Sequence, residues 1–126
     1  MDILTPQRRI RGLGSTKSGT EDWWNQRVTS VALVPLSVFV VVLMVSLIGA
    51  DHATVVARLG HPLVATGLIL TLVAVAWHMQ LGMRVVIEDY IHDHGWKVTA
   101  LVANAFFSFV VAVLGIFAVL KISFGV

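Results

Sequence analysis

The sequence predicts an all-α integral membrane protein with three transmembrane helices. Hydrophobic residues make up 57% of its 126 residues and charged residues only 13%, and the mean hydropathy is +0.87. Such values lie outside the range of soluble domains. Three apolar segments are each long enough to cross a hydrocarbon core of about 30 Å as a helix, the form in which a single segment satisfies its backbone hydrogen bonds in lipid. The expected spans are residues 28–50, 61–87 and 98–120.

The segment before the first span, residues 1–27, is polar and basic. We expect it to form a flexible tail, separate from a membrane domain of residues 28–126. The first span is too long and begins too late for a cleaved signal peptide. Trp23 and Trp24 come just before this span, at the depth where indole rings favour the headgroup region. We expect them to anchor the chain at the interface, with a docking surface for a partner protein as the alternative.

The distribution of basic residues predicts the orientation, because the side that retains lysine and arginine is normally the cytoplasm or the mitochondrial matrix. The N-terminus is therefore expected inside and the C-terminus outside. The first loop holds only Arg58 and should lie outside, whereas Arg84 and Lys97 flank an inner second loop. We expect a multi-pass protein of the bacterial cytoplasmic (inner) membrane in contact with lipid, with the mitochondrial inner membrane less favoured. A net charge of +2 is too small to indicate nucleic-acid binding.

His78 lies within the second apolar span, and the chain contains no cysteine that could hold a metal. An ionisable side chain at that depth usually faces a protein interior, a cofactor or a proton path. Gly82, four residues on, would let a flat ring or another helix approach the same helix face. If His78 binds haem iron, the second ligand must come from another polypeptide, or less favourably from Met44. The alternative is a neutral histidine hydrogen-bonded to a neighbouring helix.

Arg84, Asp89 and Tyr90 follow toward the inner end of the second span. Asp89 and Tyr90 are either a solvated boundary or a pair that donates a hydrogen bond to a quinone carbonyl and supplies protons. Tyr90 lies 12 residues after His78, about 18 Å along a continuous helix. Arg84 suits a haem propionate, and equally suits a basic side chain that extends to lipid phosphates.

The pattern His78-x3-Gly82-Met83-x5-Asp89-Tyr90 resembles the signature of the hydrophobic membrane anchor subunit of succinate dehydrogenase (complex II), the smaller of the two anchors in that family. The resemblance covers the second span and its following loop closely, and the rest by length, three-helix layout and basic tail. It implies that His78 is an axial iron ligand of a haem b shared with a second anchor subunit of the cytochrome b556 type. It also implies that Tyr90 hydrogen-bonds ubiquinone, with Asp89 as its polar neighbour.

The resemblance further implies a subunit of a respiratory enzyme of the tricarboxylic acid cycle. A flavoprotein subunit and an iron–sulfur subunit would oxidise succinate, and this chain would help to pass the electrons to ubiquinone without binding succinate. The alternatives are a structural or assembly membrane protein without haem, and the anchor of a fumarate reductase that uses menaquinol. A transporter is least favoured, because the polar and small residues of the third span are spaced as a helix-packing face. These residues are Asn104, Ser108 and Gly115.

Overall fold

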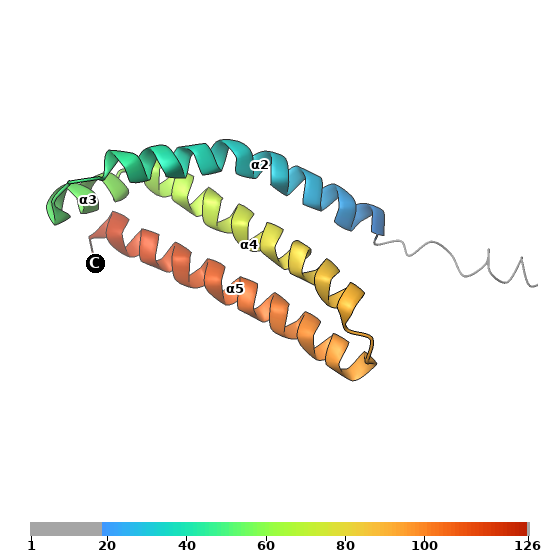
Figure 1. The fold of residues 1–126 in the computed structure, drawn as a ribbon. Helices are drawn as coiled ribbons and strands as arrows, with labels where there is room; N and C mark the ends of the chain where they lie inside the picture. Colours follow the sequence, from blue (N-terminus) through green and yellow to red (C-terminus); the bar gives the residue numbers. More distant parts are fainter. Residues whose placement is uncertain (1–18, 126) are drawn as a thin grey trace, which may run out of the picture.

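A computed structural model describes residues 19–125, and these residues form helices without any strand (Figure 1). Three helices are long and apolar enough to cross a membrane, which confirms the predicted all-α fold with three spans. The predicted orientation of the termini stays a prediction. In chain order the helices are α2 (Gly19–Ser46), α3 (His52–Leu59), α4 (Pro62–Tyr90) and α5 (His94–Phe124).

Each long helix extends beyond its predicted apolar segment at one end or both, and α2 ends four residues before its expected span does. α2 begins nine residues before the expected span, so residues 19–27 of the expected tail are helical, and residues 1–18 lie outside the described residues. Glu21 and Asp22 lie in the first turn of α2, where negative charge interacts favourably with the helix dipole. With 28 residues α2 is about 42 Å long, more than a hydrocarbon core of about 30 Å requires. The extra turns therefore suit the headgroup region.

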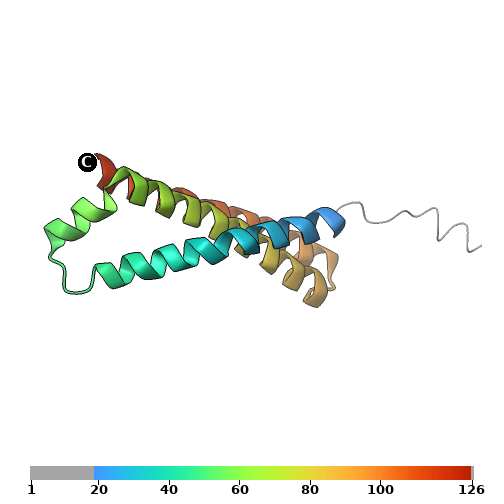
Figure 2. The ribbon, with the colours of Figure 1, turned by 90° about the horizontal axis from the view of Figure 1, so that it is seen from above.

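α4 is the middle helix of a row of three (Figure 1). It packs against α2 on one side and α5 on the other, and α2 and α5 do not pack against each other in the described part of the chain. Neighbouring long helices are antiparallel, so the start of α2, the end of α4 and the start of α5 share one end of the molecule. Seen from above, α2 crosses α4 toward that end and diverges at the other, where α3 joins them (Figure 2).

The contact between α4 and α5 uses the polar and small residues predicted to form a packing face. Asn104 and Ser108 are buried, and Asn104 Nδ2 donates a hydrogen bond to the backbone oxygen of Gln80 at 2.9 Å. A Cβ on Gly115 would lie only 2.8 Å from Cδ2 of Leu72. The predicted packing face is therefore confirmed, and Asn104 links the two helices by a hydrogen bond, whereas the buried Oγ of Ser108 has no hydrogen-bond partner among the described residues.

The short helix α3 in the first loop was not predicted. Asp51 is its N-cap and accepts a hydrogen bond from the backbone N–H of Thr54 at 3.2 Å. Arg58 Nη1 donates to the backbone oxygen of Ser46 at 2.8 Å, which ties α3 to the end of α2. The first loop is thus a folded connection at the end of the molecule away from the second loop.

Candidate functional site

His78 lies on α4, and its side chain is half-buried. Its Nδ1 is 3.0 Å from the hydroxyl oxygen of Thr29, a buried residue of α2. Within residues 19–125 no hydrogen-bond partner meets the other ring nitrogen, Nε2. The ring is therefore oriented from one side by a neighbouring helix, and its second nitrogen retains the capacity to bind another group.

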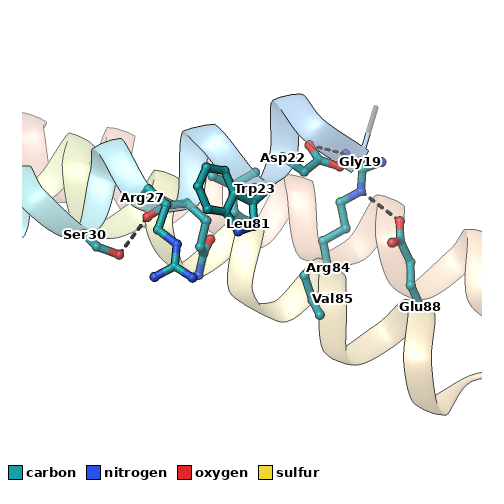
Figure 3. Close-up of a pocket in the computed structure, with 10 residues that line it drawn as sticks. Gly19, Asp22, Trp23, Arg27, Ser30, Leu81, Arg84, Val85 and Glu88 are labelled. Atoms are coloured by element: carbon teal, nitrogen blue, oxygen red, sulfur yellow. Dashed lines mark hydrogen bonds and ion pairs between the residues drawn. The ribbon is translucent and has the colours of Figure 1, made fainter. Parts of the chain in front are cut away.

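A cavity of about 330 Å³ lies between α2 and α4 (Figure 3). Its lining residues on α2 fall between Gly19 and Ser30, so most of its wall on this helix lies toward the start of α2 from Thr29. Gln26 and Ser30 of α2, which flank Thr29 closely in the sequence, contribute to its wall. The wall carries charges of both signs, contributed by both helices. Its charged members are Asp22, Arg27, Arg84 and Glu88.

The two arginines of this cavity have different environments. Arg84 Nη1 lies 3.3 Å from a carboxylate oxygen of Asp22, and Arg84 Nε lies 2.9 Å from Glu88 Oε1 (Figure 3). Its positive charge is thus compensated from both helices. The guanidinium of Arg27 lies 5.1 Å from the centroid of the Trp23 ring, a cation–π contact. Among the described residues no carboxylate forms an ion pair with Arg27.

Gly82 faces α2, as its position one turn after His78 predicts. A Cβ on Gly82 would meet only Nε2 of Gln26, at an ordinary contact distance of 3.7 Å. The side-chain oxygen of the same Gln26 is buried and has no hydrogen-bond partner in the part of the chain that the structure describes. Buried polar atoms are nearly always paired, so this oxygen marks a place where a further donor is needed.

Asp89 and Tyr90 end α4 on a different part of the surface. Tyr90 is 79% exposed and lines a second cavity, of about 510 Å³, with His92 and Trp96 at the turn into α5. Asp89 is exposed too, and no hydrogen bond joins it to Tyr90 in the described structure. α4 is continuous from His78 to Tyr90, so the predicted separation of about 18 Å along the helix holds. The chain does not bring Tyr90 into the cavity that Arg84 lines.

Sequence reasoning missed Thr29 and Gln26, because neither residue type in an apolar helix signals a contact with a distant helix.

The sequence also left Met44 open as a second iron ligand. Met44 lies 15 residues beyond Thr29 on α2, about 22 Å along the helix, too far to reach an iron atom bound to His78. Within residues 19–125 no three histidine or carboxylate side chains gather as a metal site. Any iron on His78 would need a second ligand from elsewhere.

Comparison with known proteins gives consistent matches along the chain. The family model described as "Succinate dehydrogenase/Fumarate reductase transmembrane subunit" matches residues 1–119. A succinate dehydrogenase hydrophobic membrane anchor subunit of Rickettsia bellii (strain RML369-C) is 32% identical over 88% of this chain and 89% of its own. The subunit of the same name from Paracoccus denitrificans is 27% identical over 99% and 96%. That of Rickettsia conorii (strain ATCC VR-613 / Malish 7) is 34% identical over 83% and 84%. No solved structure matches.

Proposed function

The chain belongs to the family of succinate dehydrogenase/fumarate reductase transmembrane subunits, and from this premise we propose that it anchors a succinate:ubiquinone oxidoreductase and contributes to a haem b site and a quinone site. As a succinate dehydrogenase anchor subunit it is part of an oxidoreductase complex. The proposed partners are a second anchor subunit of the cytochrome b556 type, an iron–sulfur subunit and a flavoprotein subunit. The proposed location is a bacterial cytoplasmic membrane.

The single observation that carries the haem proposal is the environment of His78. Its ring lies within a membrane-spanning helix, Nδ1 contacts Thr29, and Nε2 has no partner within the described residues. Histidine ligands of metals characteristically use one ring nitrogen for the metal and the other for an oriented hydrogen bond. The donor set of this chain therefore fits one side of a haem. Bound haem b would supply one-electron redox chemistry between the iron–sulfur subunit and the quinone.

The second axial ligand is proposed to come from the partner anchor subunit. The other histidines of this chain are near the helix ends, and His61, the N-cap of α4, is about 25 Å along the helix from His78. A haem shared between two anchors would also cover part of α4. The remaining histidines are His52, His92 and His94.

A haem propionate forms charge-assisted hydrogen bonds with a cation, and a cation already paired with carboxylates offers it less net positive charge. Arg84 was predicted for this role, yet its guanidinium lies between two carboxylates. Arg27 lines the same cavity and forms no ion pair among the described residues. We therefore propose Arg27 as the principal propionate contact, with Arg84 holding α2 and α4 together in the wall of the cavity. The role of Arg84 at the propionate stays a prediction.

The quinone site is proposed at the end of α4. The exposed phenol of Tyr90 can donate a hydrogen bond to a quinone carbonyl, and the exposed carboxylate of Asp89 lies next to it in the sequence. Partner subunits would have to cover Tyr90 before a quinone could bind there out of water. Ubiquinone is favoured over menaquinol because the named relatives are succinate dehydrogenase anchors, although the family model also covers fumarate reductases.

The test is a reduced-minus-oxidised optical spectrum of the complex, purified from its native membrane through a tag on this chain. We expect a b-type haem band in the unmodified complex, its loss in His78→Ala, and its retention in the control His52→Ala, which alters an exposed histidine of α3. The partner subunits should co-purify in all three. A colourless complex with its partners bound would indicate an anchor without haem. A colourless chain purified alone would favour a structural protein.

A further inference from the structure

The hydroxyl group of Thr29 lies close to three potential hydrogen-bond partners. Its Oγ1 is 2.8 Å from the backbone oxygen of Asn25, 3.1 Å from that of Gln26, and 3.0 Å from Nδ1 of His78. Thr29 itself is only 7% exposed, so water does not compete freely for these contacts. The position of the single hydroxyl hydrogen therefore decides which nitrogen of His78 carries a proton.

The hydrogen-bonding capacities of the groups around Thr29 favour one position for that hydrogen. A hydroxyl group donates one hydrogen bond and accepts through two lone pairs, whereas a carbonyl oxygen only accepts. In the arrangement common for threonine inside a helix, the hydrogen of Thr29 points back along α2 to a carbonyl oxygen, and that of Asn25 is the nearest of the three partners. The lone pairs of Thr29 then face His78, and Nδ1 must carry the hydrogen that joins them. A neutral imidazole with hydrogen on Nδ1 has its free lone pair on Nε2.

We propose that Thr29 is a positioning residue that holds His78 in its Nδ1–H tautomer and thereby makes Nε2 the nitrogen that binds haem iron. The inference rests on the proposed haem function and deepens it by assigning the iron-facing atom and the residue that selects it. Thr29 and His78 are 49 residues apart, on two different spanning helices. The crossing of α2 over α4 thus has a chemical consequence as well as a packing one.

A purely structural role for Thr29 would predict different behaviour from a positioning role. Thr71 provides the matched control, because its hydroxyl also donates four residues back, to the backbone oxygen of Gly67 at 2.8 Å, in a partly buried part of α4. No hydrogen bond joins Thr71 to a histidine in the described structure. Thr71→Val therefore removes the same kind of hydroxyl group from the same bundle without touching His78.

The experiment is a redox titration of haem b in the purified complex, with haem content measured alongside, for Thr29→Val, Thr29→Ser and Thr71→Val. An oxygen acceptor on Nδ1–H raises the basicity of the iron ligand, so Thr29→Val should shift the midpoint potential to more positive values. Haem affinity should fall about 10-fold to 100-fold, as for other residues that orient metal ligands. Thr29→Ser keeps the hydroxyl group and should preserve both properties, as should Thr71→Val. Thr29→Ala removes the same group and repeats the test if the valine variant does not assemble.

The outcomes separate this inference from the proposed function. Thr29→Val with retained haem and an unchanged midpoint potential would overturn the inference alone. Equal shifts in Thr29→Ser and Thr29→Val would overturn it too, because the serine hydroxyl group should suffice. A complex that lacks haem, or that keeps it in His78→Ala, would overturn the proposed function and this inference together.

Discussion

The phenol of Tyr90 has no partner within the described chain and is almost wholly exposed, which makes its role testable at the level of one atom. Tyr90→Phe removes the hydroxyl group and keeps the ring. Losing a hydrogen bond worth about 1 kcal/mol should raise the KM for ubiquinone several-fold. Steady-state ubiquinone reduction measures this effect, and the haem spectrum together with reduction of an artificial dye that accepts electrons upstream should be unaffected. Unaltered quinone kinetics would remove Tyr90 from the site.

For single residues, the sequence predicted the chemical type of a side chain and its depth in the membrane. It could not predict which residues of other helices that side chain contacts. The depth of His78 follows from the apolar run around it, and α4 carries it as predicted. Its contact with Thr29 depends on how two helices cross, and nothing in either local sequence encodes that crossing. The same holds for Arg84, whose partner Asp22 is 62 residues away. Its predicted propionate role therefore overlooked a carboxylate that only the fold brings close.

Two glycines of α4 face α2, and a Cβ atom added at each would meet α2 at very different distances. A Cβ on Gly67 would lie 2.7 Å from Cζ of Phe39, an atom of a rigid ring, whereas one on Gly82 would make an ordinary contact with Gln26. Gly67→Ala should therefore destabilise the packing of α2 on α4 by about 1–3 kcal/mol. Gly82→Ala is the matched control and should leave this packing intact. Thermal unfolding of the purified complex measures both, and equal stabilities would contradict the assigned contact.

The cap of α3 predicts a pH dependence confined to one element. Hydrogen bonds from Thr54, first from its side chain and then from its backbone N–H, hold the pKa of the Asp51 carboxyl below its ordinary value of 3.8. A lowered folded-state pKa means that the charged form is favoured in the folded helix. The stabilisation is therefore present above pH 3.8 and is lost as the pH falls through the lowered pKa. Protection of the α3 amides against hydrogen exchange, corrected for the pH dependence of intrinsic exchange, should fall over that window, and Asp51→Asn, which still accepts a hydrogen bond, should show no such step.

The hydropathy of the sequence predicted the three spans, but the helices of the structure begin and end at other residues, for a physical reason. It reports how long a segment remains apolar, while a helix continues as long as its backbone hydrogen bonds do, and α2 continues outward through Trp23, Trp24 and Arg27 to Gly19. α3 is only eight residues long and sits between spans, so an apolar-length criterion passes over it. Its N-cap Asp51 was the one local signal of a helix start.

On the scale of the whole molecule, the three spans bury little of themselves. Only 11% of the most apolar window of α2, 11% of that of α4 and 6% of that of α5 is buried within the chain. A row of three helices leaves both faces of α4 to be covered by lipid or by another subunit, and large aromatic side chains of α5 remain exposed. This open arrangement is consistent with an anchor that is completed by a second one. The exposed aromatic residues include Phe106, Phe107, Phe109 and Phe117.

The distribution of basic residues between the two ends of the molecule predicts its orientation in the membrane. Arg27 lies near the start of α2, Arg84 near the end of α4 and Lys97 near the start of α5, and these helix ends share one end of the molecule. This end should therefore face the cytoplasm, as should the basic residues that precede α2 in the sequence. The chain has no native cysteine, so single cysteines report location without background. In intact cells a membrane-impermeant maleimide should label His52→Cys, in the first loop, and should label Thr20→Cys only after detergent opens the membrane. Both positions are exposed in the structure. The reverse pattern would place the proposed quinone end on the outer side, away from the soluble subunits expected to deliver electrons.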